Sequence, residues 1–283
     1  MDLHLLTPQL KQLRLSGILE TLDVRHRQAM DEQWTYVQFL ERLLQDEVER
    51  RNQKQLTLRL RRAAFQPEKT LERFDFSFNP QLNRQQILDL ATGQFIQRKE
   101  PVLIVGPSGV GKSHLAQALG HEACRRGYDV VYVSAARLLQ HLAGGHADGT
   151  YDRRLQTYIR PDLLIIDDFG LKPLRTPAPE DFYDVINERY ERAATVVTSN
   201  RALDEWSQLF GDPLLASAGL DRLFHNAHAL VITGASFRAR GRRAEGVAPP
   251  AGVAAPRGRL PRPLDFREEV IHPQRLIRKS TLN

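Results

Sequence analysis

Cysteine is almost missing from this sequence, which has Cys124 as its single cysteine among 283 residues. One cysteine cannot close a disulfide within the chain, and no group of cysteine and histidine residues has the spacing of a zinc site. Disulfide-stabilised and zinc-stabilised folds are therefore excluded. Cys124 falls in a stretch with helical spacing, so we expect a buried thiol with a structural role.

Long hydrophobic runs are missing as well. The N-terminal segment MDLHLLTPQLKQLRL has charged residues among its leucines. It therefore matches neither the pattern of a signal peptide nor that of a membrane span. We expect a cytoplasmic protein with no membrane partner.

Proline and glycine are scarce between Met1 and Phe65, where apolar residues recur at helical spacing. This segment is predicted to be helical. Its last part is strongly basic, and six of its cations are candidate DNA contacts: Arg50, Arg51, Lys54, Arg59, Arg61 and Arg62. The alternative is a solvated helix face, since Glu47 and Glu49 lie close by in the sequence.

Acidic residues are outnumbered by basic ones, with a formal net charge of +6 and a pI of about 9.6. This balance favours a polyanionic partner, nucleic acid first, although an ordinary basic enzyme would show the same balance. Binding through such a surface is electrostatic and non-specific. We therefore predict an affinity for double-stranded DNA that falls steeply with salt concentration.

Short runs of apolar residues follow the helical segment, and they read PVLIVG, DVVYVSA, DLLIID, ATVVTSN and HALVITG. They hardly alternate with polar residues, which is typical of strands buried on both faces of a parallel sheet. Stretches of helical pattern separate them, and another helix, RQQILDLATGQFIQR, precedes the first run. This alternation of strands and helices indicates an α/β domain.

The stretch GPSGVGKS, which follows the first apolar run and precedes a helical run, has the pattern of a phosphate-binding loop. Its glycines allow the backbone to turn so that successive N–H groups point at phosphates beside a helix N-terminus. Lys112 is placed to reach the β- and γ-phosphates, and Ser113 to bind Mg²⁺. The candidate nucleotide-binding residues are Gly106, Pro107, Ser108, Gly109, Val110, Gly111, Lys112, Ser113 and His114. A glycine-rich loop without a ligand is the alternative.

Polar residues end the next strands. Asp167 and Asp168 close the run LLIIDD, and Asn200 follows ATVVTS. Asp167 is suited to the Mg²⁺ shell, while Asp168 stands where a glutamate often activates water, with one methylene less of reach. Asn200 is a candidate to contact the γ-phosphate or the attacking water, with Thr198 and Ser199 as helpers. The alternatives are plain strand termination and turn chemistry.

Two arginines near the end of the α/β region are candidates for stabilising charge on a transferring phosphoryl group: Arg222 on a predicted helix, and Arg238 after the last strand. If such an arginine comes from a neighbouring subunit, hydrolysis depends on assembly. The alternative for each arginine is a surface ion pair.

The order of these motifs over residues 1 to 238 closely resembles the AAA+ ATPases of the helicase-loader clade, and within it the IstB-like helpers of insertion-sequence transposition. The stretches that carry the resemblance include GPSGVGKSHLAQALGHEACRRGYDVVYV, LLIIDDFGL and GLDRLFHNAHALVITGASFR. It implies Walker A at the phosphate loop, Walker B at Asp167 and Asp168, and sensor 1 at Asn200. It also implies a trans-acting arginine finger at Arg222 and a sensor-2 arginine at Arg238.

The resemblance implies an AAA+ P-loop NTPase core with a parallel sheet, preceded by a small all-helical domain. We expect a helical domain that binds DNA or a partner over residues 1–70 and an ATPase domain over 71–238. Residues 239–283 are rich in arginine, proline, glycine and alanine, so we expect a disordered tail that either binds nucleic acid weakly or is an inert extension. The chain departs from the family pattern at Gly219, Ala235 and Phe237, where members usually or often have a larger apolar residue, glutamate and tyrosine.

The implied activity is hydrolysis of ATP with Mg²⁺, coupled to binding of double-stranded DNA. In this family the ATP-bound protein self-assembles on DNA and recruits the transposase. Three alternatives remain open from the residues: a replicative helicase loader, a small-molecule kinase, and a nucleotide-gated DNA scaffold that does not hydrolyse ATP.

Overall fold

All the apolar runs that the sequence singles out are strands of one parallel sheet in the computed structural model, which describes residues 3–79, 82–234 and 236–237. The strands are β1 (Val102–Val105), β2 (Val130–Ser134), β3 (Leu163–Phe169), β4 (Ala194–Ser199) and β5 (His228–Val231). Their order across the sheet is β2-β3-β4-β1-β5. The predicted parallel α/β sheet is therefore confirmed.

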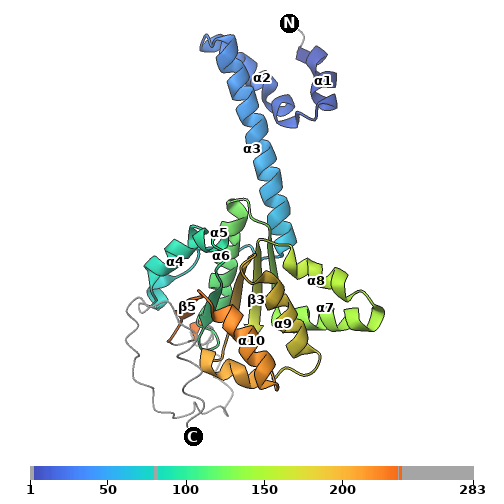
Figure 1. Ribbon diagram of the computed structural model, residues 1–283. Coiled ribbons are helices and arrows are strands. Elements are labelled where there is room, and N and C mark those ends of the chain that lie inside the picture. Colours follow the sequence, from blue (N-terminus) through green and yellow to red (C-terminus); the bar gives the residue numbers. More distant parts are fainter. Residues whose placement is uncertain (1–2, 80–81, 235, 238–283) are drawn as a thin grey trace, which may run out of the picture. The chain divides into compact units, whose positions relative to one another are not determined.

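Helices connect the strands and also make up the N-terminal part of the described chain (Figure 1). The α-helices are α1 (Thr7–Gln12), α2 (Ser16–Asp31), α3 (Tyr36–Ala63), α4 (Arg84–Ala91), α5 (Gln94–Gln97), α6 (Lys112–Arg125), α7 (Ala135–Asp148), α8 (Tyr151–Ile159), α9 (Ala178–Arg189) and α10 (Pro213–Phe224). The short 3-10 helices are η1 (Leu3–Leu6), η2 (Phe76–Phe78) and η3 (Leu203–Leu209). Several helices begin at a polar cap; Asp212, for example, accepts hydrogen bonds from the amides of Leu214 and Leu215.

One prediction about helices is wrong in detail. The stretch RQQILDLATGQFIQR was expected to be one helix, but α4 ends at Ala91 and α5 begins at Gln94. Gly93 lies between them with a φ of 80°, a left-handed conformation that stops a helix and that glycine adopts at little cost. The predicted helical segment from Met1 to Phe65 is confirmed over its described part, with turns after α1 and α2.

Helices pack against both faces of the sheet (Figure 1). Side chains alternate along each strand, so successive residues contact the helices of opposite faces. Leu103, Leu164 and Val197 join one buried cluster with residues of α7, α9 and α10. Ile165 points to the other face, where its Cδ1 atom lies beside Gly120 of α6. Both faces are thus buried, which explains why the strands read as continuous apolar runs. Cys124 is buried, as expected from the sequence.

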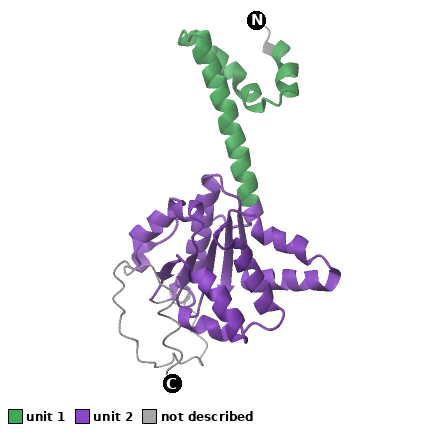
Figure 2. Ribbon diagram, viewed as in Figure 1, with its two compact units in different colours: residues 1–61 green, residues 62–283 purple. Residues whose placement is uncertain are grey.

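The chain divides into two compact units, residues 1–61 and 62–283, which Figure 2 shows in different colours. In the first unit, Ile18 and Leu22 of α2 pack against Leu43 of α3. The predicted domains 1–70 and 71–238 remain predictions about folding and function. Arg238 and the segment 239–283 lie outside the described residues. Among the residues that are described, no helix has the length and hydrophobicity needed to span a membrane.

Candidate functional site

The loop from Gly106 to Ser113 connects β1 to α6 and depends on its glycines. Gly106 has a φ of 151°, and a Cβ atom there would lie 2.0 Å from the carbonyl oxygen of Ile232. Gly111 has a φ of 101° and precedes the first turn of α6, where a Cβ atom would lie 3.1 Å from the Phe74 ring. Side chains at these positions would strain the backbone or collide with it. The loop therefore turns directly into the N-terminus of α6, where backbone N–H groups are suited to binding phosphate.

Lys112 lies at the centre of the site and is 5% exposed. Its Nζ atom donates hydrogen bonds to the carbonyl oxygen of Pro107, at 2.7 Å, and to Oδ1 of Asn200, at 2.5 Å. Asn200 directly follows β4, and the amide of Gly106 donates to the carbonyl oxygen of Ser199 at 3.2 Å. The structure thus brings together the predicted lysine and asparagine, which are 88 residues apart.

Asp167 is held by two hydroxyl groups. Its Oδ1 atom accepts a hydrogen bond from Thr198 and its Oδ2 atom accepts one from Tyr132, each at 2.5 Å. The carboxylate is 4% exposed. Burial, followed by the hydrogen bond to Asp167, raises the pKa of Tyr132 well above its ordinary value, so Tyr132 stays protonated and donates. The two donors fix the carboxylate at the end of β3.

Asp168 is in an irregular part of the sheet. The register between β3 and β4 shifts between Ile166 and Phe169, so the two acids form a bulge. Asp168 has a φ of 57°, and its amide donates to the Thr198 hydroxyl at 3.0 Å. Left-handed backbone at a non-glycine residue is costly and persists where the surroundings hold it in place. The Thr198 hydroxyl is the group that holds the Asp168 backbone in this conformation.

The donor set at this edge of the sheet fits ATP with Mg²⁺. Backbone N–H groups and the Lys112 ammonium suit phosphate oxygens, whereas a serine hydroxyl and a carboxylate suit Mg²⁺. Lys112 contacts Asn200, and Asp167 lies near the end of β3, because β1, β3 and β4 are parallel neighbours that end at the same edge of the sheet. The side chain of His114 instead turns to the segment before the sheet, with Nε2 2.9 Å from the carbonyl oxygen of Thr70.

Residues before and after the sheet lie beside the phosphate loop. Phe74 packs edge-on against His114, with ring centroids 5.2 Å apart. Phe237 donates its amide to the carbonyl oxygen of Gly109 at 2.9 Å, and its ring packs against Phe78. The phosphate loop is therefore contacted both by the segment before the sheet and by the segment after it. Arg238, the predicted sensor-2 residue, comes next in the chain and is outside the described residues.

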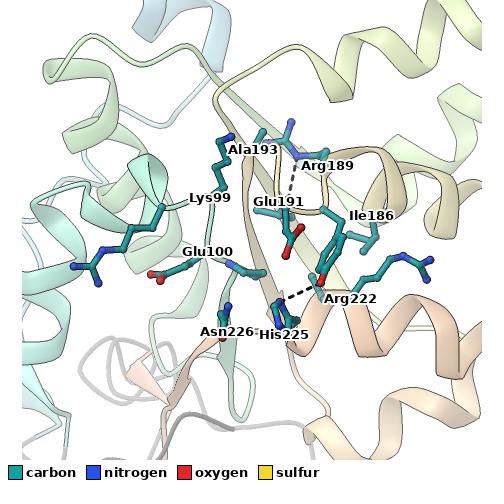
Figure 3. A pocket seen from close by; sticks show the side chains of 14 residues that line it. Lys99, Glu100, Ile186, Arg189, Glu191, Ala193, Arg222, His225 and Asn226 are labelled. Atoms are coloured by element: carbon teal, nitrogen blue, oxygen red, sulfur yellow. Dashed lines mark hydrogen bonds between the residues drawn. The ribbon is translucent and has the colours of Figure 1, made fainter. Parts of the chain in front are cut away.

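Arg222 lies elsewhere, in the last turn of α10 ahead of β5. It lines a cavity of about 120 Å³ together with Lys99, Glu100, His225 and Asn226 (Figure 3). Those neighbours directly precede β1 and β5, so the cavity is at the edge of the sheet where strands begin. Figure 3 shows the Arg222 side chain running away from His225 and Asn226. The structure does not bring Arg222 together with the phosphate loop of its own chain.

The six predicted DNA contacts differ in their surroundings. Arg50 pairs with Glu20 at 2.9 Å and Arg51 with Glu47 at 2.6 Å, while Arg59 donates to the side chain of Gln55. The other three, Lys54, Arg61 and Arg62, are exposed on α3. The ion pair of Arg50 joins α3 to α2, whereas that of Arg51 lies within α3, as in the alternative of a helix face whose cations have acidic neighbours.

Sequence reasoning missed Tyr132. The signal was a tyrosine inside the apolar run DVVYVSA, because a phenol within a sheet usually has a hydrogen-bond partner. The identity of the partner could not be inferred from the sequence, because it depends on how β2 pairs with β3. That pairing places Tyr132 opposite Ile165 and Ser134 opposite Asp167. Sequence reasoning also missed Tyr183, whose ring lies 5.4 Å from the guanidinium carbon of Arg222.

Comparison with known proteins shows the family of this chain. The family described as IstB-like ATP binding protein matches residues 8–245. An ATP-binding protein in an insertion sequence of Mycobacterium tuberculosis is 42% identical over 82% of this chain and 93% of its own length. The ATP-binding protein of insertion sequence IS21 from Pseudomonas aeruginosa is 37% identical, over 87% and 92% of the two chains.

Solved structures support the fold. The replication initiator DnaA, bound to AMPPCP and single-stranded DNA, has a TM-score of 0.50 and 23% identity over 65% of this chain and 57% of that one. DnaI has a TM-score of 0.50 and 20% identity over 61% and 94%. At this identity the likeness shows the AAA+ P-loop fold alone. Given the family match and the curated relatives, this chain belongs to the IstB-like ATP-binding proteins.

Proposed function

We propose that this chain is an ATP-hydrolysing helper of transposition that assembles on double-stranded DNA and recruits a transposase. The observation that carries the proposal is the contact of Lys112 with Asn200 beside the phosphate loop, with Asp167 held at the end of the strand next to β4. The names of the relatives, which are ATP-binding proteins of insertion sequences, support the link to transposition.

In this proposal the backbone N–H groups of the phosphate loop hold the β- and γ-phosphates, and Lys112 exchanges its contact with Asn200 for a phosphate oxygen. Ser113 and Asp167 hold Mg²⁺, which supplies positive charge next to the phosphates. Asp167 needs little rearrangement for this role, because Thr198 and Tyr132 already fix its carboxylate. Fixed groups lower a barrier more than groups that must first reorient.

Asp168 and Asn200 are the candidates for orienting the attacking water. Asp168 accepts the proton of that water, and the side-chain amide of Asn200 holds the water or the γ-phosphate in line. Asp167 accepts hydrogen bonds from Thr198 and Tyr132, whereas Asp168 has left-handed backbone at the bulge in β3. The two acids therefore have separate tasks, one at the metal and one at the water.

Arg222 acts on a neighbouring subunit in this proposal. His228 of β5 pairs with Val102, the first residue of β1, and Arg222 precedes β5, whereas the phosphate loop follows Val105. Four residues of strand span about 13 Å, so Arg222 and the loop lie at opposite edges of the sheet. An arginine in this position serves an ATP molecule held by another chain, which makes hydrolysis depend on assembly.

The test is ATP turnover with and without duplex DNA over a range of protein concentrations. We expect turnover per chain to rise with both, and Arg222→Ala to lower it by about 10³-fold while ATP binding is retained. Arg192→Ala, which removes an exposed arginine paired with Glu188, is the control and should leave turnover unchanged.

Two results would contradict the proposal. Tight ATP binding without turnover would favour the alternative of a nucleotide-gated DNA scaffold that does not hydrolyse ATP. Turnover per chain that changes neither with protein concentration nor with DNA would favour a kinase-like enzyme, in which Arg222 has no part in the reaction.

A further inference from the structure

We propose that Tyr183 is a positioning residue for Arg222, and that it holds the guanidinium in the orientation in which it reaches a neighbouring subunit. This inference rests on the proposed function, because it gives Arg222 a task outside its own chain. It concerns a contact between α9 and α10 that the sequence motifs do not include.

The contact is a cation over an aromatic face. The guanidinium carbon of Arg222 lies 5.4 Å from the centre of the Tyr183 ring. At the same time, Nη1 of Arg222 donates a hydrogen bond to the carbonyl oxygen of Ala218 at 2.8 Å. Both side chains are half-buried. Two contacts of different kinds thus fix a side chain that otherwise rotates about several bonds.

The helices hold Tyr183 in place. Phe182, Val185 and Ile186 bury the inner face of α9 in the core, which leaves Tyr183 on the side that meets α10. On α10, a Cβ atom at Gly219 would lie 3.5 Å from Cδ2 of Tyr183. This distance is ordinary van der Waals contact, so the ring packs directly against α10 three residues before Arg222. The helix itself continues through Gly219 without a break.

The two contacts have a consequence for reaction rate. A free arginine side chain loses conformational freedom when it binds a phosphate oxygen in the transition state, whereas a side chain that is already ordered loses less. A cation–π contact orders the guanidinium and leaves its positive charge in place. A carboxylate partner would neutralise that charge. Loss of the ring is therefore expected to lower turnover while ATP binding stays the same.

The experiment compares Tyr183→Leu with Tyr183→Phe in the full chain, at saturating duplex DNA. We expect turnover of Y183L to fall about tenfold with an unchanged Kd for a fluorescent ATP analogue. Y183F keeps the ring face and should keep turnover within about twofold of the wild type. A fall for Y183F equal to that for Y183L would overturn the role of the ring.

Mixing subunits separates positioning from damage to the fold. Asp167→Asn disables hydrolysis in its own chain but keeps Arg222, so mixing it with Y183L supplies intact arginines to Y183L sites. We expect turnover per Y183L chain to rise several-fold on mixing. A Y183L chain that stays slow in the mixture has a defect in its own site, which would overturn the proposal.

The wild type and R222A tell this inference apart from the proposed function. If R222A abolishes turnover and Y183L does not lower it, only the role of Tyr183 is wrong. If wild-type turnover is independent of assembly, the role of Arg222 in a neighbouring subunit is wrong, and that of Tyr183 with it.

Discussion

A buried carboxylate such as Asp167 costs free energy unless hydrogen bonds compensate for the lost water. Thr198 and Tyr132 provide these bonds, and both come from strands that neighbour β3. The Thr198 hydroxyl also accepts the amide of Asp168. A single threonine on β4 therefore connects the side chain of one acid with the backbone of the next.

Tyr132→Phe removes one donor to Asp167 without changing the shape of the strand. We expect ATP turnover to fall by about 10- to 100-fold, because a hydrogen bond to a charged group contributes about 1.5–3 kcal/mol. ATP affinity should change little, since the loop holds the phosphates. Tyr128→Phe, in the turn before β2, is the matched control. Equal turnover of Y132F and wild type would show that Thr198 alone orients the acid.

Arg189 is a buried arginine with a structural task. It is 1% exposed and donates to the carbonyl oxygens of Tyr158 and Pro161 and to the Thr195 hydroxyl, among other acceptors. Burial lowers its pKa to about 9, so it remains protonated at neutral pH. The guanidinium connects the end of α8 with the start of β4.

Arg189→Met should leave several buried carbonyl groups without a donor. We expect a loss of about 3 kcal/mol in the free energy of unfolding, or a Tm lower by about 6–12 °C for a unit of this size. Scanning calorimetry measures this transition. The exposed Arg192→Met is the control and should shift Tm little. If the Tm of R189M shifted as little as that of R192M, water would have replaced the guanidinium as the donor to these carbonyl groups.

At the scale of elements, α2 and α3 meet through acids on α3. Glu47 is 5% exposed and accepts the amide of Gly17 at 2.6 Å as well as the guanidinium of Arg51. Burial by itself raises the pKa of Glu47, but the hydrogen bonds from Arg51, Gly17 and Ile18 outweigh it, and the pKa is lowered below 4.5. A hydrogen bond from Arg25 likewise lowers the pKa of Asp46.

These lowered pKa values predict an acid-sensitive helix pair. An acid with a lowered pKa in the folded state stabilises it at neutral pH, and this stabilisation is lost as the pH falls below about 4.5 and through the folded-state pKa. Trp34 lies in the turn between α2 and α3, so its fluorescence in a Trp206→Phe background reports urea unfolding of this unit. We expect the urea midpoint to be lower at pH 3 than at pH 7.

Glu47→Gln is the matched variant for this measurement. It keeps the shape of the side chain and one acceptor but no charge, so it should be less stable at pH 7 and lose less stability on acidification. An unchanged pH dependence in E47Q would assign the effect to other acids.

At the scale of the whole molecule, the net charge of +6 favours a polyanionic partner, but not every arginine is available to bind one. Lys54, Arg61 and Arg62 are exposed, whereas Arg50 and Arg51 are paired with glutamates. The pairing reduces the net charge that those two residues offer to a phosphate.

This difference predicts the salt dependence of DNA binding. Replacing Lys54, Arg61 and Arg62 together by alanine should reduce the slope of log K against log salt by about 2.7, at about 0.9 for each phosphate contact. The double change of Arg50 and Arg51 should reduce it much less. Fluorescence anisotropy with labelled duplex DNA measures both slopes. Equal slopes for the two variants would place the DNA surface elsewhere.

The local sequence determined the elements and most of the chemistry of the site. Apolar runs marked the strands, helical spacing marked the helices, and the spacing of glycines, Lys112 and Ser113 marked the phosphate loop, because each depends on near neighbours in the chain. The break between α4 and α5 at Gly93 was not predicted, because an isolated glycine inside a helical pattern is often tolerated.

The tertiary structure decided which of these residues meet. Strand order places β3 and β4 beside one another and brings Tyr132 to Asp167, and the direction of β5 places Arg222 at the far edge beside Tyr183. It also placed Arg50 in an ion pair with Glu20 of α2. Contacts of this kind join positions far apart in the chain, or depend on how helices turn toward each other. Spacing along a single sequence does not contain them, because they follow from the packing of both faces of the sheet and of α2 on α3.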